Sequence, residues 1–328
     1  MFVAGDAFMP SFSTTGFSLP AAGPFQPERL QAALRPVLSS DEASQGLQAY
    51  RAFYGLPDTF EHRLGRLSVG GYELAAQLWL PEEPRATLIL LHGYYDHLGL
   101  YGHLLRWALE MGFAVLGCDL PGHGLSSGAR ASIGEFAEYQ TVLDGLFIQA
   151  AELQLPAPWH LAGQSTGGAI LLDYLLTGAP RPEEGQTLLF APLVRPLAWH
   201  WSLLSYRLMR PFAESIPRRF YANSHDAEFI DFVQNRDPLQ PQHLPTAWVG
   251  ALSRWIPHIE AAPRSARKPL VVQGQGDMTV DWRHNLSVLQ AKFDQPELII
   301  LPEARHHLVN ERADLRRYYF DRLSQRLA

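Results

Sequence analysis

The sequence predicts an α/β protein with a mostly parallel sheet that is covered by helices on both faces. Short, continuous apolar runs such as residues 87–92 and 113–119 are typical of strands buried on both sides. Segments with a helical pattern, such as residues 100–111 and 134–153, separate these runs. Such alternation is typical of parallel strands that are joined by helical crossovers.

The predicted elements can be followed along the chain. Residues 1–26 are irregular, and residues 27–54 are helical with a break near Pro36 and a new start at residues 40–42. Two antiparallel strands come next, joined at Gly70 and Gly71. The full set of predicted strands is 62–69, 72–80, 87–92, 113–119, 159–162, 187–191, 269–274 and 297–301. The helices between and after the later strands are 100–111, 134–153, 167–177, 282–293 and 311–327.

The alternation stops between residues 192 and 267, a stretch rich in proline and aromatic residues. Its ten aromatic residues of interest are Trp199, Trp201, Tyr206, Phe212, Phe220, Tyr221, Phe229, Phe232, Trp248 and Trp255. We expect a lid inserted over the carboxyl edge of the sheet, although these aromatic residues could also form a small core of the lid itself. The predicted organisation is an N-terminal extension (1–59), a core (60–191 and 268–328) and a lid (192–267).

Composition excludes several classes of protein. The 328 residues include 27 basic and 33 acidic side chains, a net charge of −6, and no basic tract, which argues against a nucleic-acid partner. The one cysteine, Cys118, excludes an internal disulfide and lies in an apolar run typical of a core thiol. No stretch is long enough to span a bilayer, and residues 1–26 lack Lys and Arg, so we expect a cytoplasmic protein. Composition predicts no oligomeric state.

A glycine-flanked serine marks the candidate site. Ser165 lies in Gly163-x-Ser165-x-Gly167, between a predicted strand and a predicted helix, which is the nucleophile-elbow pattern. Side chains at the two glycines would collide with the strand and the helix, and the N–H of Thr166 would face a developing oxyanion. The alternative is an ordinary turn with an exposed serine.

A serine nucleophile needs a base and a group that orients the base. Asp277 and His306 follow successive strands downstream of Ser165, in the order that this class of fold uses. Asp281 and His307 are close alternatives. Asp277 is preferred because it comes sooner after its strand, whereas spacing does not choose between the histidines. This chemistry requires no metal and no organic cofactor, and we expect neither.

The loop after strand 87–92 is expected to supply the second oxyanion donor. Gly93 permits the turn, and the backbone N–H of Tyr94 would pair with that of Thr166. His92 is expected to brace this loop by hydrogen bonds.

Several motifs together resemble one enzyme group. They are residues 91–101 (LHGYYDHLGLY), 119–126 (DLPGHGLS), 163–168 (GQSTGG), 237–239 (DPL), 274–280 (GQGDMTV) and 304–306 (ARH). From Phe60 to the C-terminus, the chain resembles the monoacylglycerol lipase/lysophospholipase group of α/β-hydrolases, also described as serine-aminopeptidase-like. The resemblance implies an α/β-hydrolase fold and a triad of Ser165, Asp277 and His306.

The sequence departs from that group at two places in the first motif. Tyr94 and Tyr95 stand where small residues are usual, and Leu100 stands where arginine is common. Tyr94 and Tyr95 would therefore affect the size and polarity of the acyl pocket. The candidate substrate contacts are Tyr94, Tyr95 and Gln164.

The leading hypothesis is a serine hydrolase of carboxylic esters, with a lipid-like monoacylglycerol or lysophospholipid substrate and transient contact between the lid and a membrane surface. A peptidase or amidase is an alternative, for which a lid carboxylate (Glu214, Glu228 or Glu260) would bind a free amine. A non-catalytic binding protein of the same fold is a third. Ser165 argues against epoxide hydrolases and dehalogenases, which need a carboxylate at the elbow.

Overall fold

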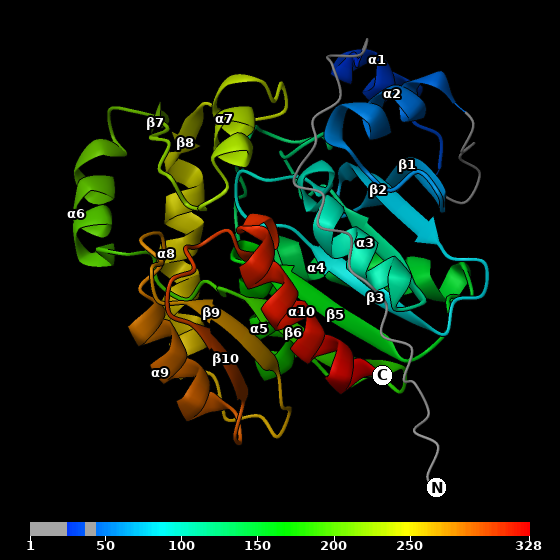
Figure 1. Ribbon diagram of the computed structural model, residues 1–328. Coiled ribbons are helices and arrows are strands. Elements are labelled where there is room, and N and C mark those ends of the chain that lie inside the picture. Colours follow the sequence, from blue (N-terminus) through cyan, green and yellow to red (C-terminus); the bar gives the residue numbers. More distant parts are fainter. Residues whose placement is uncertain (1–24, 37–43) are drawn as a thin grey trace, which may run out of the picture.

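The computed structural model describes residues 25–36 and 44–328, which form an eight-stranded sheet with helices on both faces (Figure 1). The strand order is β1-β2-β4-β3-β5-β6-β9-β10. All neighbours are parallel except the pairs β1–β2 and β2–β4. The strands are β1 (Glu61–Val69), β2 (Tyr72–Leu80), β3 (Ala86–Leu91), β4 (Phe113–Cys118), β5 (Trp159–Gln164), β6 (Glu184–Phe190), β9 (Leu270–Gly274) and β10 (Glu297–Leu301). The predicted mostly parallel α/β sheet is confirmed.

Strand β3 shows why the central apolar runs are continuous. Leu88 and Leu90 pack in the hydrophobic core on one face of the sheet, and Ile89 and Leu91 pack in the core on the other face. Successive side chains of a strand point to opposite faces, so a strand with two covered faces needs apolar residues at every position.

The helices divide between the two faces. The core on one face includes residues of α4 (Ala137–Glu152), α5 (Thr166–Thr177) and α9 (Trp282–Lys292). The other core includes residues of α3 (Gly102–Glu110) and α10 (Ala313–Leu327), which lie in front of the sheet in Figure 1. Helix α3 is preceded by a 3-10 turn at Leu98–Tyr101, so the predicted helix 100–111 begins as a tighter turn.

The N-terminal region contributes two helices to the second core. They are α1 (Pro27–Ala33) and α2 (Gln45–Tyr54), and the Ser44 side chain caps α2 by accepting a bond from the Leu47 N–H. Pro36 forms an isolated bridge with Arg66 between the helices, consistent with the predicted break. Residues 1–24 of the predicted irregular stretch 1–26, and the predicted helix start at 40–42, lie outside the described residues.

Residues 192–267 connect β6 to β9, two strands that are neighbours in the sheet. The segment contains α6 (Trp199–Met209), β7 (Ser215–Pro217), α7 (Ala227–Asn235), β8 (His243–Pro245) and α8 (Thr246–Ala261), which Figure 1 shows together on one side of the sheet. Its aromatic side chains divide into two sets. The buried set is Trp199, Phe229, Phe232, Trp248 and Trp255, and the exposed set includes Trp201, Phe212 and Tyr221.

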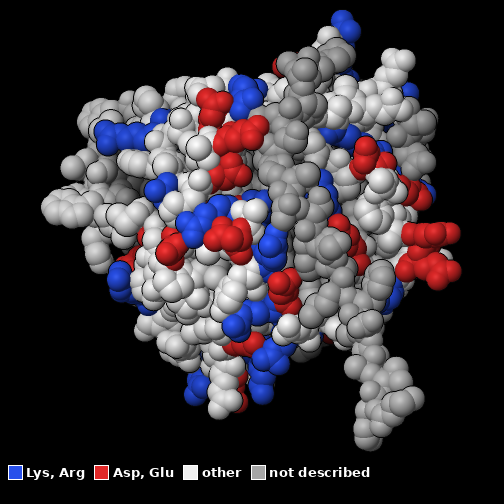
Figure 2. Space-filling view, viewed as in Figure 1, with Lys and Arg blue, Asp and Glu red and all other residues white. Residues whose placement is uncertain are grey.

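Three further observations concern the surface, the helices and the core. Acidic and basic side chains are interspersed over the described part of the face shown in Figure 2. Among the described residues, no helix combines the length and the apolar character needed to cross a bilayer. The Cys118 side chain is fully buried, as the apolar run around it predicts.

Candidate active site

Ser165 lies at the sharp turn between β5 and α5. Its φ of 53° and ψ of −109° place a non-glycine residue in the left-handed half of backbone space, which is costly and is retained mainly at functional sites. A Cβ on Gly163 would lie 2.4 Å from the carbonyl carbon of Gly167, and a Cβ on Gly167 would lie 2.2 Å from the Leu91 oxygen. The predicted steric requirement for glycine on both sides of Ser165 is therefore present in the structure.

The structure brings Ser165, His306 and Asp277 into one hydrogen-bonded row. Nε2 of His306 lies 2.9 Å from Oγ of Ser165, and Nδ1 lies 2.7 Å from Oδ2 of Asp277. All three residues are buried, at 8%, 5% and 2% exposure. Ser165 follows β5, Asp277 follows β9 and His306 follows β10, so segments at the carboxyl ends of three parallel strands meet here.

The two close alternatives have other contacts. Asp281 caps α9, where its side chain accepts a hydrogen bond from the His284 N–H. Nε2 of His307 lies 3.1 Å from a carboxylate oxygen of Asp96. The geometry thus separates each predicted pair, because only Asp277 and His306 lie in the row with Ser165.

The loop that carries Tyr94 lies directly against the serine. A Cβ placed on Gly93 would lie 3.5 Å from Cβ of Ser165. The Gly93 N–H donates to the Tyr101 hydroxyl (2.8 Å), which donates in turn to Asp96 (2.9 Å). Because Asp96 also faces His307, one carboxylate ties the Tyr94 loop to the histidine loop.

His92 braces the same loop, as expected from the sequence. Its Nδ1 lies 2.7 Å from the Gly93 oxygen, and its Nε2 accepts a bond of 2.8 Å from the Leu120 N–H. Burial lowers the pKa of His92, which agrees with a neutral ring whose Nε2 acts as an acceptor. Burial, together with the nearby His92, lowers the pKa of His123 to about 3, so this second ring is also neutral.

The predicted substrate contacts have different surroundings. The Tyr94 ring stacks on Trp248 of α8 at 3.8 Å, and its hydroxyl donates to the Ala131 carbonyl. Tyr95 has a φ of 70° and lies beneath the guanidinium of Arg218, 4.0 Å from its ring centre. Gln164 is buried and donates to the backbone oxygen of His306 (2.9 Å). Thus Gln164 steadies the histidine loop, and its contact with substrate stays a prediction.

Electrostatics favours an ionised Asp277. Burial by itself raises the pKa of this carboxyl, but the interaction with His306 and the N–H groups of Thr279 and Val280 outweighs burial and holds the pKa below its ordinary value. The Gln273 side chain gives a further hydrogen bond of 3.2 Å. An ionised Asp277 stabilises a protonated His306, as a base in this position requires.

Sequence reasoning missed the support of the histidine loop. The buried Glu311 carboxylate accepts bonds from the Arg305 N–H (2.7 Å) and from Nδ1 of His225 (3.0 Å), and the His307 N–H donates to the Asn223 carbonyl. Asn223 and His225 are more than 80 positions from His307 and Glu311 in the chain, so no local pattern could indicate these two contacts.

The region of the chain that the structure describes has no group of three or more His, Cys, Asp or Glu side chains that could hold a metal ion. The hydroxyl, imidazole and carboxylate of the row suit acyl transfer.

Known proteins resemble this chain in sequence. Residues 82–313 match the family described as serine aminopeptidase, S33. A monoacylglycerol lipase of Mycolicibacterium smegmatis is 33% identical over 117 residues, which are 35% of this chain and 41% of the relative. The human monoglyceride lipase is 26% identical over 259 residues, 75% of this chain and 83% of the relative. The match with the first of these relatives therefore spans less than half of its length.

Solved structures share the fold at low sequence identity. A monoacylglycerol lipase of Paleococcus ferrophilus superposes with a TM-score of 0.67 at 17% identity, covering 78% of this chain and 98% of the other. A soluble variant of the Saccharomyces cerevisiae monoglyceride lipase, bound to a substrate analogue, gives 0.66 at 18% identity, covering 80% and 94%. The fold is thus the α/β-hydrolase fold, and the chain belongs to the serine aminopeptidase (S33) family.

Proposed function

We propose that the protein is a serine hydrolase of carboxylic esters. The observation that carries this proposal is the hydrogen-bonded row from Ser165 through His306 to Asp277, at 2.9 and 2.7 Å. A serine hydroxyl becomes an effective nucleophile when an oriented base accepts its proton. Relatives named as monoacylglycerol lipase and monoglyceride lipase also support ester cleavage.

The mechanism follows from the positions of the groups. Oγ of Ser165 attacks the acyl carbon while Nε2 of His306 takes the proton, and Asp277 holds the imidazole in the required tautomer. The N–H groups of Tyr94 and Thr166 stabilise the oxyanion, since the first turn of a helix has N–H groups with no partner inside the helix. His306 then protonates the leaving alcohol, and water releases the acid from the acyl-enzyme.

Ester cleavage is favoured over the peptidase alternative. Among the three lid carboxylates considered, Glu260 is already bonded to Arg195 (2.6 Å) and to His284 (2.9 Å), and Glu214 and Glu228 are exposed on the surface. None of the three is therefore both buried and free to bind a substrate amine. The direct test is a panel of acyl esters assayed beside an aminopeptidase substrate. Turnover of the peptide substrate with a higher kcat/KM than any ester would reject the proposal.

Arg218 favours an anionic group on the substrate, and therefore a lysophospholipid over a neutral monoacylglycerol. Its guanidinium lies between the rings of Tyr95 and Phe220, at 4.0 and 4.2 Å, and donates to Gln240 (2.7 Å). Within the described residues it forms no ion pair with a carboxylate. It lies beside the proposed oxyanion loop, where its charge would attract a phosphate.

A pair of adjacent arginines allows a matched test of this preference. Arg218→Gln should lower kcat/KM for a lysophospholipid relative to a monoacylglycerol with the same chain, whereas Arg219→Gln, at an exposed neighbour, should leave the ratio unchanged. Equal ratios in wild type and Arg218→Gln would remove Arg218 from substrate recognition.

We further propose that residues 192–267 act as a lid that contacts membrane surfaces transiently. Helix α6 and the turn after it expose apolar side chains, with Trp201 at 72%, Leu208 at 63% and Phe212 at 87% exposure. A large exposed apolar patch is typical of an interaction site. Co-sedimentation with phospholipid vesicles should decrease when Trp201 and Leu208 are both changed to Glu. A cytoplasmic location remains an expectation from the sequence.

A further inference from the structure

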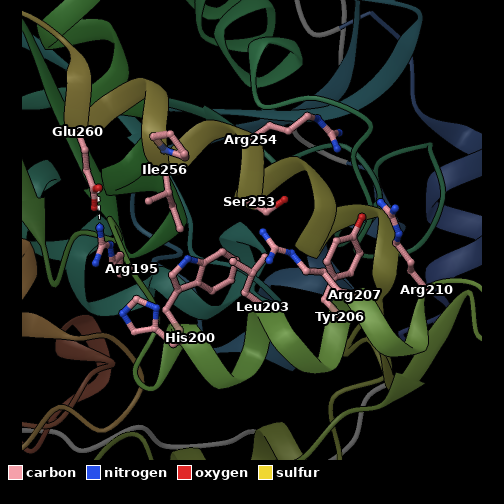
Figure 3. A pocket seen from close by; sticks show the side chains of 12 residues that line it. Arg195, His200, Leu203, Tyr206, Arg207, Arg210, Ser253, Arg254, Ile256 and Glu260 are labelled. Carbon is pink, nitrogen blue, oxygen red and sulfur yellow. Dashed lines mark hydrogen bonds and ion pairs between the residues drawn. The ribbon is translucent and has the colours of Figure 1, made fainter.

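A groove of about 670 Å³ runs between α6 and α8, and no residue of the proposed triad lines it (Figure 3). Its α6 wall includes Trp199, Leu203 and Arg207, which share one face of the helix because they are spaced by four residues. Its α8 wall includes Arg254 and Ile256. The volume lies within the range of about 300–1,000 Å³ that is typical of small-molecule sites.

The groove carries more positive charge than the protein neutralises. Four arginines line it, and two of them have carboxylate partners: Arg195 pairs with Glu260 at 2.6 Å, and Arg254 pairs with Glu135 at 2.8 Å. Arg207 and Arg210 form no ion pair with any carboxylate in the described part of the chain. Arg207 lies in the last turn of α6 and Arg210 is the C-cap residue of that helix, at the end where positive charge is favoured.

The middle of the groove is apolar. Trp199, Leu203 and Ile256 line it beside the two arginines, so a charged end and an apolar strip share one cavity. Figure 3 shows the guanidinium of Arg207 directed into the space between the helices. Trp199 and Ile256 are largely buried, so the exposed apolar surface of the strip comes mainly from Leu203. A free anion would neutralise the arginines but leave this surface in water, and a neutral chain would cover it but leave the arginines unpaired.

We propose that this groove binds a single-chain lipid whose head is a phosphate monoester. The phosphate contacts Arg207 and Arg210, and the alkyl chain lies along Trp199, Leu203 and Ile256. A phosphate monoester carries about 1.5 to 2 negative charges at pH 7, which matches two unpaired guanidinium groups better than a carboxylate does. The site is separate from the triad, and it does not depend on the hydrolytic function.

The test is calorimetric titration of the full chain with dodecyl phosphate, kept below the concentration at which it forms micelles. Inorganic phosphate, dodecanoate and neutral dodecyl maltoside are titrated in parallel. We expect dodecyl phosphate to bind at least about tenfold more tightly than each of the others, since only this ligand makes both the charged and the apolar contacts. Inorganic phosphate or dodecyl maltoside binding equally tightly would overturn the two-part site, and dodecanoate binding more tightly would overturn the phosphate head.

Two variants locate the binding in the groove. Changing Arg207 and Arg210 together to Gln should weaken dodecyl phosphate binding at least about tenfold, because charge-assisted hydrogen bonds are lost. The control changes Arg219 and Arg283, exposed arginines outside the groove, and should bind as wild type does. Any binding of dodecyl phosphate at the triad occurs equally in wild type and in both double variants, so it does not affect their comparison. Unchanged binding in the first variant, or an equal loss in the control, would overturn the proposal.

A third variant tests the chain-binding part without changing charge. Leu203→Trp should fill the apolar strip and weaken dodecyl phosphate about tenfold while leaving the weak binding of inorganic phosphate unchanged. Unaltered binding of dodecyl phosphate would show that the chain does not lie in the groove.

Discussion

The hydroxyl of Tyr54 donates a hydrogen bond of 2.8 Å to Oδ1 of Asp237. This contact joins helix α2, in the N-terminal extension, to the proposed lid. Oδ2 of Asp237 lies 3.0 Å from Nε2 of His97, and all three residues are buried. Because His97 follows the proposed oxyanion loop, the extension, the lid and that loop meet at one carboxylate. The extension is thus part of the framework around the site.

The first prediction tests this junction. Tyr54→Phe removes a hydrogen bond to a buried carboxylate and should lower the free energy of unfolding by about 1–3 kcal/mol. Urea denaturation measures the change. Tyr318→Phe is the control, because Tyr318 is 46% exposed and its loss should have little effect. Equal stability of wild type and Tyr54→Phe would show that the contact contributes nothing to the fold.

The buried His97–Asp237 pair predicts a pH-dependent stability. Burial alone lowers the pKa of His97, but Asp237 and the nearby Asp119 outweigh burial and raise it above its ordinary value. A group with a raised pKa in the folded state stabilises the fold fully below its unfolded pKa, and this stabilisation is lost as the pH rises through the raised pKa. The stability advantage of wild type over His97→Gln should therefore shrink with rising pH.

Urea unfolding at a series of pH values above 5 measures that difference, since Asp237 remains ionised there. His243→Gln, at an exposed position of β8, provides the comparison and should differ from wild type by the same amount throughout. A wild-type advantage that grows toward alkaline pH would mean that His97 is neutral in the folded protein.

Ser165→Ala should fold normally and lose at least about 10³-fold in kcat/KM on acyl esters. The reason is that no other group in the row can attack the acyl carbon. Ser287→Ala, on the exposed face of α9, should retain activity. Labelling with a fluorophosphonate followed by peptide mapping checks the assignment, and modification of a different serine would refute it.

Asp277→Asn and Asp281→Asn form a matched pair. The first should reduce kcat on the order of 10³–10⁴-fold, because the amide cannot hold His306 in the tautomer that accepts the Ser165 proton. The second should change kcat little, since asparagine caps a helix as well as aspartate does. If Asp281→Asn proves to be the damaging change, Asp281 is the acid of the triad and Asp277 is not.

The acyl preference gives a further prediction. Burying each methylene of an acyl chain contributes roughly 0.8 kcal/mol, so kcat/KM should rise a few-fold per carbon until the pocket is full. We expect Tyr94 and Tyr95 to narrow the approach to Ser165, which should favour one chain over a triester. The measurement is kcat/KM for acyl chains from two to about sixteen carbons. A steady fall from acetate onward would indicate that the aromatic residues of the lid pack only on each other.

The fold could be predicted because its signals are local. Apolar runs such as β3 indicate strands with two covered faces, and Ser165, Asp277 and His306 each follow such a run at a carboxyl end. The choice of His306 over His307 needed a resemblance, because adjacent residues share the same local pattern. The structure separates them through Asp96, a partner 211 positions from His307 in the chain. The Tyr54–Asp237 contact spans 183 positions, and no periodicity encodes it.

The environment of Cys118 has a practical consequence. This thiol is the only one in the chain, it is fully buried, and burial raises its pKa, so little reactive thiolate forms near neutral pH. A cysteine introduced at an exposed position of α6, such as Trp201→Cys, would then be the single site that a maleimide fluorophore modifies. Movement of the proposed lid could thus be followed by fluorescence in the full-length chain, with no need to remove a native cysteine first.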